Sequence, residues 1–296
     1  AAVLIEADPG GVVHFRDAAY PCPARVPMPD FQAWSPEHPK LYDFTVTLGE
    51  DQVKSYFAMR KFSVSEGKLC LNNEPYFHNG VLDQGYNPEG LLTYPSDEAM
   101  LRDIRLAKAM GFNTLRKHMK TEPLRWYYHC DGLGMLVWQD MPCGGGPYNP
   151  AVISLPLFTG RHMRDDRYAL FGRKDAVGRK RFTHELREMI NTLYNCPCIA
   201  LWTPFNEGWG QFDAAAALDL VNELDGTRTV SHASGWHDQG VGETRDEHVY
   251  FRKYRFAPDP QGRAVLLSEF GGYNLRVLGH TWNDRNYGYN NCRDER

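Results

Sequence analysis

One stretch decides the fold class of this chain: Ile199-Ala200-Leu201-Trp202-Thr203-Pro204-Phe205-Asn206-Glu207. It begins with a run of apolar side chains, which is typical of a strand buried on both faces of a parallel sheet. An amide and a carboxylate follow where that strand should end, at Asn206 and Glu207. The stretch therefore predicts a buried strand over 199–205 that carries polar groups at its carboxyl end.

Strands and helices alternate on both sides of this stretch. Helical patterns cover 96–110, with Ser96 as N-cap and Gly111 just past the end, and also 122–131, 178–194 and 213–224. The other strands are expected at 75–82, 112–116, 135–138, 229–232, 248–251 and 265–268, with a Gly- and Pro-rich loop at 142–156. Seven βα-type units predict an α/β protein, and a (β/α)8 TIM barrel fits better than an open sheet because no Gly-rich phosphate fingerprint follows the first strand. We assign residues 67–296 to this barrel and expect its eighth strand to be absent.

Residues 1–66 have a different composition, which is rich in proline and in strand formers. Polar and apolar side chains alternate over 41–48, a turn follows at 49–51, and a second strand is expected over 53–64. Because two strands alone do not form a stable sandwich, the earlier strands of this β domain are expected within 1–26 or outside this sequence. We therefore interpret 1–66 as the C-terminal part of a β domain.

Composition and charge exclude several classes of partner. The 33 basic and 37 acidic residues give a net charge of −4, which leaves no polycationic surface for nucleic acid or anionic lipid. No window approaches the length of apolar sequence that a membrane span requires, and the first residues show no signal peptide. The 7 cysteines are an odd number spread thinly along the chain, so we expect free thiols and a cytoplasmic location.

Polar and aromatic side chains stand at the ends of the expected strands. In chain order these are His78-Asn79-Gly80 with Asp83 and Gln84, Arg116-Lys117-His118, Trp138-Gln139-Asp140, Asn206-Glu207, His232 with Trp236, Tyr250, and Glu269. In a barrel enzyme the carboxyl ends of the strands meet at one rim, where the catalytic residues lie. Carboxylates for chemistry, aromatic rings for sugar faces and polar groups for hydroxyls would meet there. The pattern is typical of a carbohydrate site.

Glu207 and Glu269 form the sharpest pair. Each follows an apolar run that should be fully buried, so each carboxylate is paired, shifted in pKa or catalytic. Glycoside cleavage needs two such groups, an acid that protonates the leaving oxygen and a carboxylate on the other side of the anomeric carbon. The alternative is that each Glu forms a structural ion pair with an Arg. Because two glutamates in this chain each follow a buried apolar run, we favour a catalytic role over two separate structural ion pairs.

Four sequence segments resemble glycoside hydrolase family 2, which contains β-galactosidases, β-glucuronidases and β-mannosidases. They are Trp202-Thr203-Pro204-Phe205-Asn206-Glu207-Gly208-Trp209-Gly210, the stretch from Trp34 to Tyr42, Arg60-Lys61-Phe62 with Leu71-Asn72-Asn73-Glu74-Pro75, and Gly111–His118 with Cys130-Asp131-Gly132-Leu133-Gly134. The first resembles the acid/base motif of the family. The resemblance covers about residues 34–273 and implies that 1–66 is the C-terminal part of an immunoglobulin-like β-sandwich domain ahead of the barrel.

The resemblance also implies roles for individual residues. Glu207 would be the general acid/base, and Glu269 would be the nucleophile of a double displacement that retains anomeric configuration. Asn206 would hydrogen-bond the sugar 2-hydroxyl. Tyr250 would lie beside the nucleophile, and Arg116 would lie beneath it and help to keep it ionised.

Further candidates rest on their position alone. His118, His232, Trp236 and Asp83 are candidates to line the sugar pocket, and a buried structural role is the alternative for each. Trp209 and Trp138 are candidates for stacking on sugar rings or for packing, while Asp131 is expected at a solvated or capping position. Some family members bind magnesium through a carboxylate on strand three. Because this chain has Trp138-Gln139-Asp140 there, we expect neither a metal nor another cofactor.

The sequence therefore predicts a retaining, exo-acting β-glycosidase that hydrolyses a terminal β-linked sugar, with β-galactosidase-like activity as the first hypothesis and a carbohydrate as the partner. One alternative is a catalytically silent or truncated carbohydrate-binding relative. Another is a metal-dependent barrel hydrolase, which would need a His-x-His pair at strand one. Strand one offers only His78, which argues against that alternative.

Overall fold

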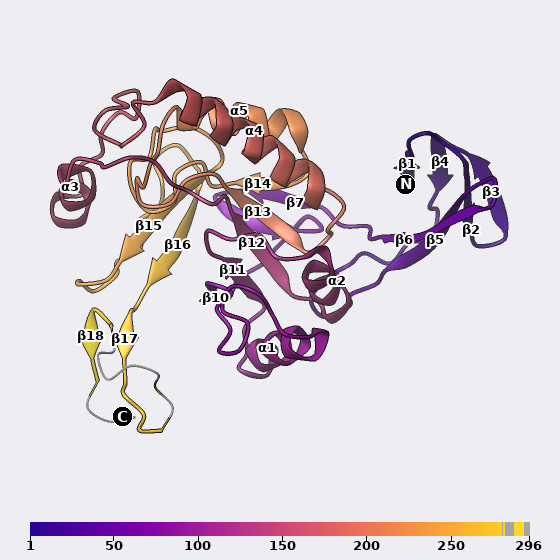
Figure 1. The fold of residues 1–296 in the computed structure, drawn as a ribbon, viewed down its shortest axis with the longest axis horizontal. Helices are drawn as coiled ribbons and strands as arrows, with labels where there is room; N and C mark the ends of the chain where they lie inside the picture. The colour runs from indigo at the N-terminus through magenta and orange to yellow at the C-terminus, as the bar shows by residue number, and fades with distance from the viewer. Residues whose placement is uncertain (280, 282–286, 293–296) are drawn as a thin grey trace. The chain divides into compact units, whose positions relative to one another are not determined.

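The computed structural model of the chain describes residues 1–279, 281 and 287–292 (Figure 1). The chain forms two compact units. The first unit comprises 1–63, 70–139 and 190–200, and the second comprises 64–69, 140–189 and 201–296. Among the described residues, no helix is both long and apolar enough to cross a membrane. All seven cysteines are free thiols.

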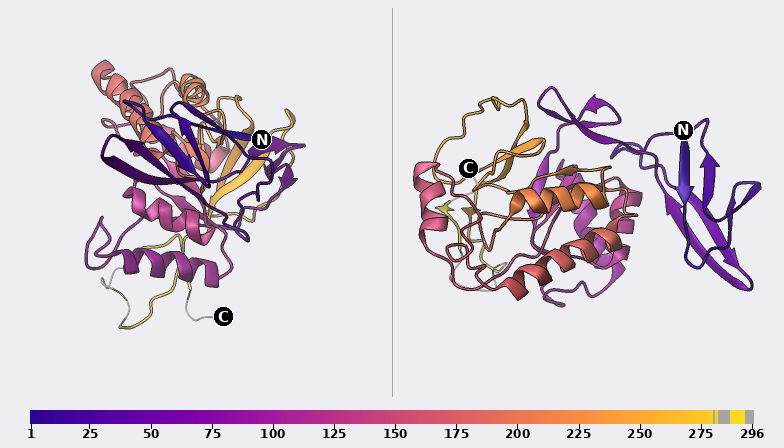
Figure 2. Two further views of the ribbon diagram at one scale, coloured as in Figure 1. Left: turned by 90° about the vertical axis from the view of Figure 1, so that its right-hand side faces the viewer. Right: turned by 90° about the horizontal axis from the view of Figure 1, so that it is seen from above.

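The N-terminal part of the first unit is made of antiparallel strands, which lie together in both views of Figure 2. They are β1 (Ala2–Ile5), β2 (Val12–Phe15), β3 (Ala18–Pro21), β4 (Ala24–Pro27), β5 (Tyr42–Leu48) and β6 (Asp51–Phe57). β1 pairs with β4, and a four-stranded sheet has the order β3-β2-β5-β6. Alternate side chains of β2 and β4 point into a core around Val13, Phe15 and Val26. Four strands therefore lie within residues 2–27, ahead of β5.

The rest of the first unit contains parallel strands and two helices. β7 (Phe62–Ser65), β8 (Lys68–Leu71) and β9 (Glu74–Pro75) are short and precede them. β10 (Gly80–Asp83), β11 (Thr114–Lys117) and β12 (Leu136–Asp140) then pair in parallel, and Val137 N donates to Cys198 O just before the next strand. α1 (Asp97–Ala109) and α2 (Leu124–Leu133) connect these strands and pack against each other. As expected, Ser96 caps α1, because its side chain accepts a hydrogen bond from Ala99 N.

Asp131 is a buried connector in the first unit. We expected a solvated or capping position, but Asp131 is 0% exposed. Its Oδ2 accepts a hydrogen bond from the Tyr56 hydroxyl at 2.7 Å, and its Oδ1 accepts one from Cys198 N at 2.7 Å. Its main-chain carbonyl accepts a third from Trp34 Nε1 at 2.8 Å. The side chain therefore joins β6 and α2 to the residues that lead into β13.

The second unit continues the parallel pattern. β13 (Ile199–Thr203), which begins in the first unit, pairs in parallel with β14 (Thr229–Val230), and the sheet has the order β10-β11-β12-β13-β14. β15 (Thr244–Val249) and β16 (Ala264–Phe270) form a parallel pair with a bulge between Glu247 and His248. The helices are α3 (Ala151–Thr159), α4 (Ala176–Leu193) and α5 (Ala214–Leu224), and β17 (Tyr273–Asn274) pairs with β18 (Asn290–Asn291). This order of parallel strands and helices agrees with the predicted α/β class.

Several element boundaries differ from the prediction. The expected loop at 142–156 contains the start of α3, because Pro150 stands just before the first helical turn, where its missing N–H costs nothing. Strand one begins only at Gly80, where pairing with Thr114 starts, so Asp83 ends the strand instead of following it. The sixth strand ends at Val249, one residue before Tyr250.

Candidate active site

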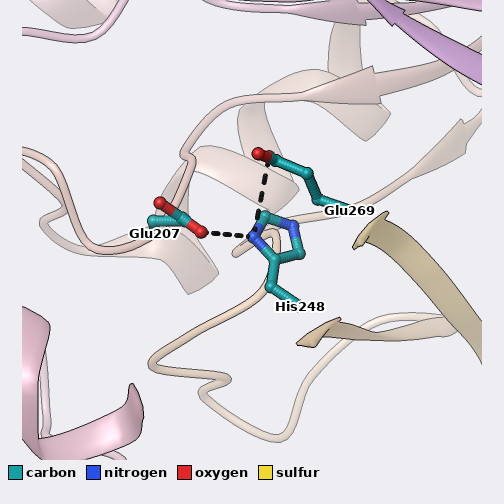
Figure 3. Close-up of side chains that lie close together, drawn as sticks. All are labelled: Glu207, His248 and Glu269. Atoms are coloured by element: carbon teal, nitrogen blue, oxygen red, sulfur yellow. Dashed lines mark hydrogen bonds and ion pairs between the residues drawn. The ribbon is translucent and has the colours of Figure 1, made fainter. Parts of the chain in front are cut away.

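Three side chains of the second unit meet at the ends of β13, β15 and β16 (Figure 3). His248 Nδ1 lies 2.8 Å from Glu207 Oε1 and 3.7 Å from Glu269 Oε2. One ligand atom from each of these three residues lies within 4.8 Å of the other two. The His248 side chain is 0% exposed, whereas the side chains of Glu207 and Glu269 are 11% and 17% exposed. The two glutamate side chains therefore approach the same nitrogen of a buried imidazole, and each side chain is itself partly exposed.

The backbone places Glu207 by a sharp turn after β13. Glu207 has φ of 51°, in the left-handed region that glutamate rarely adopts, and the next residue, Gly208, has φ of 71°. Glu207 N donates to Ser234 O, and Ser234 N donates to Phe205 O. These bonds fix the strained turn from both sides. Such strain is common at functional sites, because the surrounding structure must hold it in place.

His248 is a site residue that we did not predict. It lies at the bulge of β15, and its other ring nitrogen, Nε2, lies 3.1 Å from Ser234 Oγ. Ser234 Oγ in turn lies 3.2 Å from Ser268 Oγ, which precedes Glu269. One signal was present in the sequence: Asp246, His248 and Tyr250 alternate and so point to one face of a strand. Whether this face of the strand packs in the core or lines a site depends on the neighbouring strands, which the sequence does not place.

Tyr250 contacts the same cluster. Its hydroxyl donates to Glu207 Oε1 at 2.6 Å. Burial, followed by the negative charges of Glu207 and Glu269, raises the pKa of Tyr250. The phenol therefore stays protonated and remains a hydrogen-bond donor. The family resemblance implied a tyrosine beside the nucleophile; here Tyr250 interacts with both carboxylates.

Opposing influences set the pKa of Glu207. Burial alone would raise it, but the hydrogen bond and charge of His248 and the hydrogen bonds from Tyr250 and Trp209 outweigh burial and lower it. In the free site the carboxylate is therefore stabilised as an anion beside His248.

Three other predicted residues lie in the second unit. Asn206 is 3% exposed, and its backbone bridges to Ser234 beside Glu207. Trp236 is 6% exposed, with its ring centre 6.5 Å from that of His248. His232 Nε2 lies 3.1 Å from Asp238 Oδ1 and 3.2 Å from Gln239 N. Asn206 and Trp236 thus adjoin the cluster, whereas His232 has partners in the loop that follows it.

The remaining predicted residues lie in the first unit, and their roles in the site stay predictions. Arg116 is buried in β11. Asp83 Oδ2 forms an ion pair with Lys117 Nζ at 2.7 Å, and Asp83 Oδ1 accepts a hydrogen bond from Gly85 N. His118 N donates to Asp83 O. Asp83 therefore has charged and main-chain partners of its own.

The chemistry of the cluster allows two uses. Glu207, His248 and Glu269 are the one group among the described residues with enough close His, Cys, Asp or Glu ligands to hold a metal ion. The same cluster also places the carboxyl groups of Glu207 and Glu269 close together, and glycoside cleavage uses two such carboxyl groups.

Comparison with known families matches both parts of the chain. The family model described as "Glycosyl hydrolases family 2, TIM barrel domain" matches residues 62–270. A second model, "Glycosyl hydrolases family 2", matches residues 8–60.

Curated relatives and solved structures agree with this match. A β-galactosidase of Lactococcus lactis is 26% identical over 84% of this chain and 26% of its own length. A β-galactosidase of Vibrio vulnificus is 37% identical over 68% of this chain and 18% of its own length. The chain thus spans no more than about a quarter of these relatives. The crystal structure of a β-galacturonidase from Eisenbergiella tayi superposes with a TM-score of 0.67 at 20% identity, covering 92% of this chain and 52% of that chain, and so shares the fold.

Proposed function

Because the chain belongs to glycosyl hydrolases family 2, we propose that its site hydrolyses a terminal β-linked sugar and retains the anomeric configuration. One observation carries the proposal: one carboxylate oxygen of Glu207 lies within 4.8 Å of one carboxylate oxygen of Glu269. Retaining glycosidases hold their carboxyl groups about 5–5.5 Å apart, whereas inverting enzymes need about 6.5–9.5 Å to admit a water molecule. The spacing favours direct attack on the sugar.

The reaction takes two steps in this proposal. Glu207 must be protonated when the substrate is bound, although the free site favours its anion. Glu269 then attacks the anomeric carbon while Glu207 gives its proton to the departing glycosidic oxygen, which leaves a glycosyl ester on Glu269 and an alcohol. Glu207, now ionised, takes a proton from water, and the resulting oxygen attacks the ester and releases the sugar with Glu269 as a carboxylate.

His248 and Tyr250 prepare Glu207 for both steps. Their hydrogen bonds to Oε1, at 2.8 and 2.6 Å, stabilise the anion that forms when Glu207 loses its proton. They also hold the carboxyl group in one orientation. Ser234 contacts the far nitrogen of His248 and keeps the ring in place.

The other predicted residues complete the proposed sugar site. Asn206 would bind the 2-hydroxyl, Arg116 would keep Glu269 ionised, and Asp83, His118, His232 and Trp236 would line the pocket. The barrel of 67–296 and the immunoglobulin-like assignment of 1–66 likewise remain part of the proposal. The consecutive parallel strands and the antiparallel N-terminal sheet support them.

Galactose is the first sugar to test, because both relatives named above are β-galactosidases. The experiment is a panel of phenyl β-glycosides, assayed with the wild type and with Glu269→Gln. We expect turnover of one sugar, release of its β-anomer as first product, and a loss of roughly a thousandfold or more in the variant.

Two further variants make the test specific. Glu207→Gln should lose turnover of phenyl glycosides, because the departing phenolate needs a proton. With the 2,4-dinitrophenyl glycoside, which needs none, the intermediate should accumulate in this variant, and added azide should raise turnover by attacking it without base catalysis. Glu223→Gln, on the exposed side of α5, should be silent. Release of the α-anomer, or full activity in Glu269→Gln, would contradict the mechanism. No turnover of any sugar, with binding retained, would favour a carbohydrate-binding role.

A further inference from the structure

The two oxygens of Glu207 have different surroundings. Oε1 accepts hydrogen bonds from Tyr250 at 2.6 Å and from His248 at 2.8 Å. Oε2 lies 3.4 Å from Trp209 Nε1, which is a much weaker contact. A proton destined for the leaving group is therefore best carried by Oε2, since Oε1 already accepts from two strong donors. The side of the site on which Oε2 lies is the side where the leaving group departs.

Two aromatic rings stand on that side. Trp209 is 36% exposed although its indole N–H points to Glu207. Tyr148 packs edge-on against it, with ring centres 4.9 Å apart and planes at 80°. Aromatic faces bind the apolar faces of pyranose and aryl rings. An exposed indole that touches the acid is thus placed to contact the group the acid protonates.

Hydrogen bonds and close packing hold the backbone under both rings. Gly146 N donates to Gly172 O and Asn149 N donates to Leu170 O, so hydrogen bonds anchor the Tyr148 loop on both sides of that residue. Gly210, with φ of 62°, packs so tightly that a Cβ there would overlap the Gly144 carbonyl. The Trp209 and Tyr148 loops therefore lie in direct contact.

We infer that Trp209 and Tyr148 form the leaving-group subsite, which takes an aryl ring or the apolar face of a second sugar. This inference rests on the proposed function of Glu207 as the acid. In this inference, Trp209 and Tyr148 determine which leaving group the enzyme prefers, whereas other residues recognise the terminal sugar. A ring bound there gains stacking energy, whereas a leaving group without a ring gains none.

The test compares Trp209→Ala with Trp209→Phe on three substrates of the sugar that the wild type accepts. The leaving group of the 2,4-dinitrophenyl glycoside has a ring but needs no protonation. The leaving group of the glycosyl fluoride has no ring and needs no acid. The leaving group of the phenyl glycoside has a ring and also needs a proton from the acid. For Trp209→Ala we expect kcat/KM to fall about tenfold on the dinitrophenyl glycoside and to stay unchanged on the fluoride. Trp209→Phe should recover most of that loss.

The pattern of losses separates the possible roles of Trp209. A loss confined to the phenyl glycoside would show that Trp209 only positions the acid, and an equal loss on the fluoride would show a general distortion; either result overturns the inference. Phe158→Ala, which removes an exposed ring on α3, is the matched control and should change nothing.

Equilibrium binding tests the subsite without turnover. Phenyl and methyl 1-thio-β-galactosides share a sugar and resist cleavage, so their affinities can be measured by calorimetry. The wild type should prefer the phenyl compound, and Trp209→Ala should reduce that preference about tenfold. An unchanged ratio would refute the subsite even if the enzyme proved active. An inactive wild type that kept the preference would refute the proposed hydrolysis and leave the subsite standing.

Discussion

Replacing Asp131 should reveal how strongly one buried carboxylate holds the first unit together. Its side chain accepts hydrogen bonds from Tyr56 Oη and Cys198 N, both at 2.7 Å. In Asp131→Ala both donors lose their acceptor inside the protein. Each buried unsatisfied donor costs about 1–3 kcal/mol, so the free energy of unfolding should fall by about 2–6 kcal/mol.

Asp131→Asn is the informative companion variant. Its oxygen can still accept from Cys198 N, and its amide can donate to Tyr56 Oη, because a phenol oxygen also accepts hydrogen bonds. We expect a loss of about 1 kcal/mol, close to that of Tyr56→Phe, which removes a single hydrogen bond. The large difference between Asn and Ala distinguishes unsatisfied donors from a simple loss of charge.

Equilibrium denaturation with guanidinium, followed by tryptophan fluorescence, measures these differences. Trp34 serves as an internal reference, because its indole donates to the main-chain carbonyl of residue 131, which every variant retains. Equal losses for Asn and Ala would show that charge, not hydrogen-bond satisfaction, matters at this position. A loss below about 1 kcal/mol for Ala would refute the reasoning altogether, since it would mean that water satisfies both donors.

Three other perturbations have expected outcomes. His248→Gln should lower kcat/KM on phenyl glycosides about 10- to 100-fold, because the anion of Glu207 loses a charge-assisted hydrogen bond; steady-state kinetics with the dinitrophenyl glycoside as control would show a smaller effect. Burial lowers the pKa of His237 to about 4, so as the pH falls the imidazole becomes protonated in the unfolded chain before it does in the folded protein. The free energy of unfolding should therefore fall by about 3 kcal/mol between pH 6.5 and pH 4. Urea denaturation at several pH values should show a weaker pH dependence for His237→Gln than for the wild type. Lys117→Met should destabilise the protein by about 3 kcal/mol, because it leaves Asp83 and Glu122 without the buried ammonium that contacts both; thermal unfolding that matched the wild type would contradict this expectation.

The sequence by itself was sufficient to predict the class of fold. Buried parallel strands read as continuous apolar runs, and 199–203 and 264–270 lie where such runs occur. Helix α1 begins and ends at the predicted signals, because capping is a local interaction between neighbouring residues. Boundaries set by pairing with distant strands were less accurate. Strand one is an example, since its start depends on where Thr114 lies.

The candidate site divides in the same way. Glu207 and Glu269 could be selected from the sequence because each carboxylate directly follows an apolar run, and the mismatch is visible locally. His248 could not, because a histidine in a strand points into the core or into a site depending on what lies opposite. Only the tertiary structure brought Glu207 and Ser234 to its two ring nitrogens.

Asp131 shows the same limit for stability. Its sequence neighbours indicate a helical surface, and its burial follows from Tyr56, 75 positions earlier, and Cys198, 67 positions later. The sequence determined which segments are strands and helices and which carboxylates follow them, because those are local properties of the chain. The tertiary structure decided which polar side chains share protons and hydrogen bonds, because these depend on distances of about 3 Å between residues far apart in sequence.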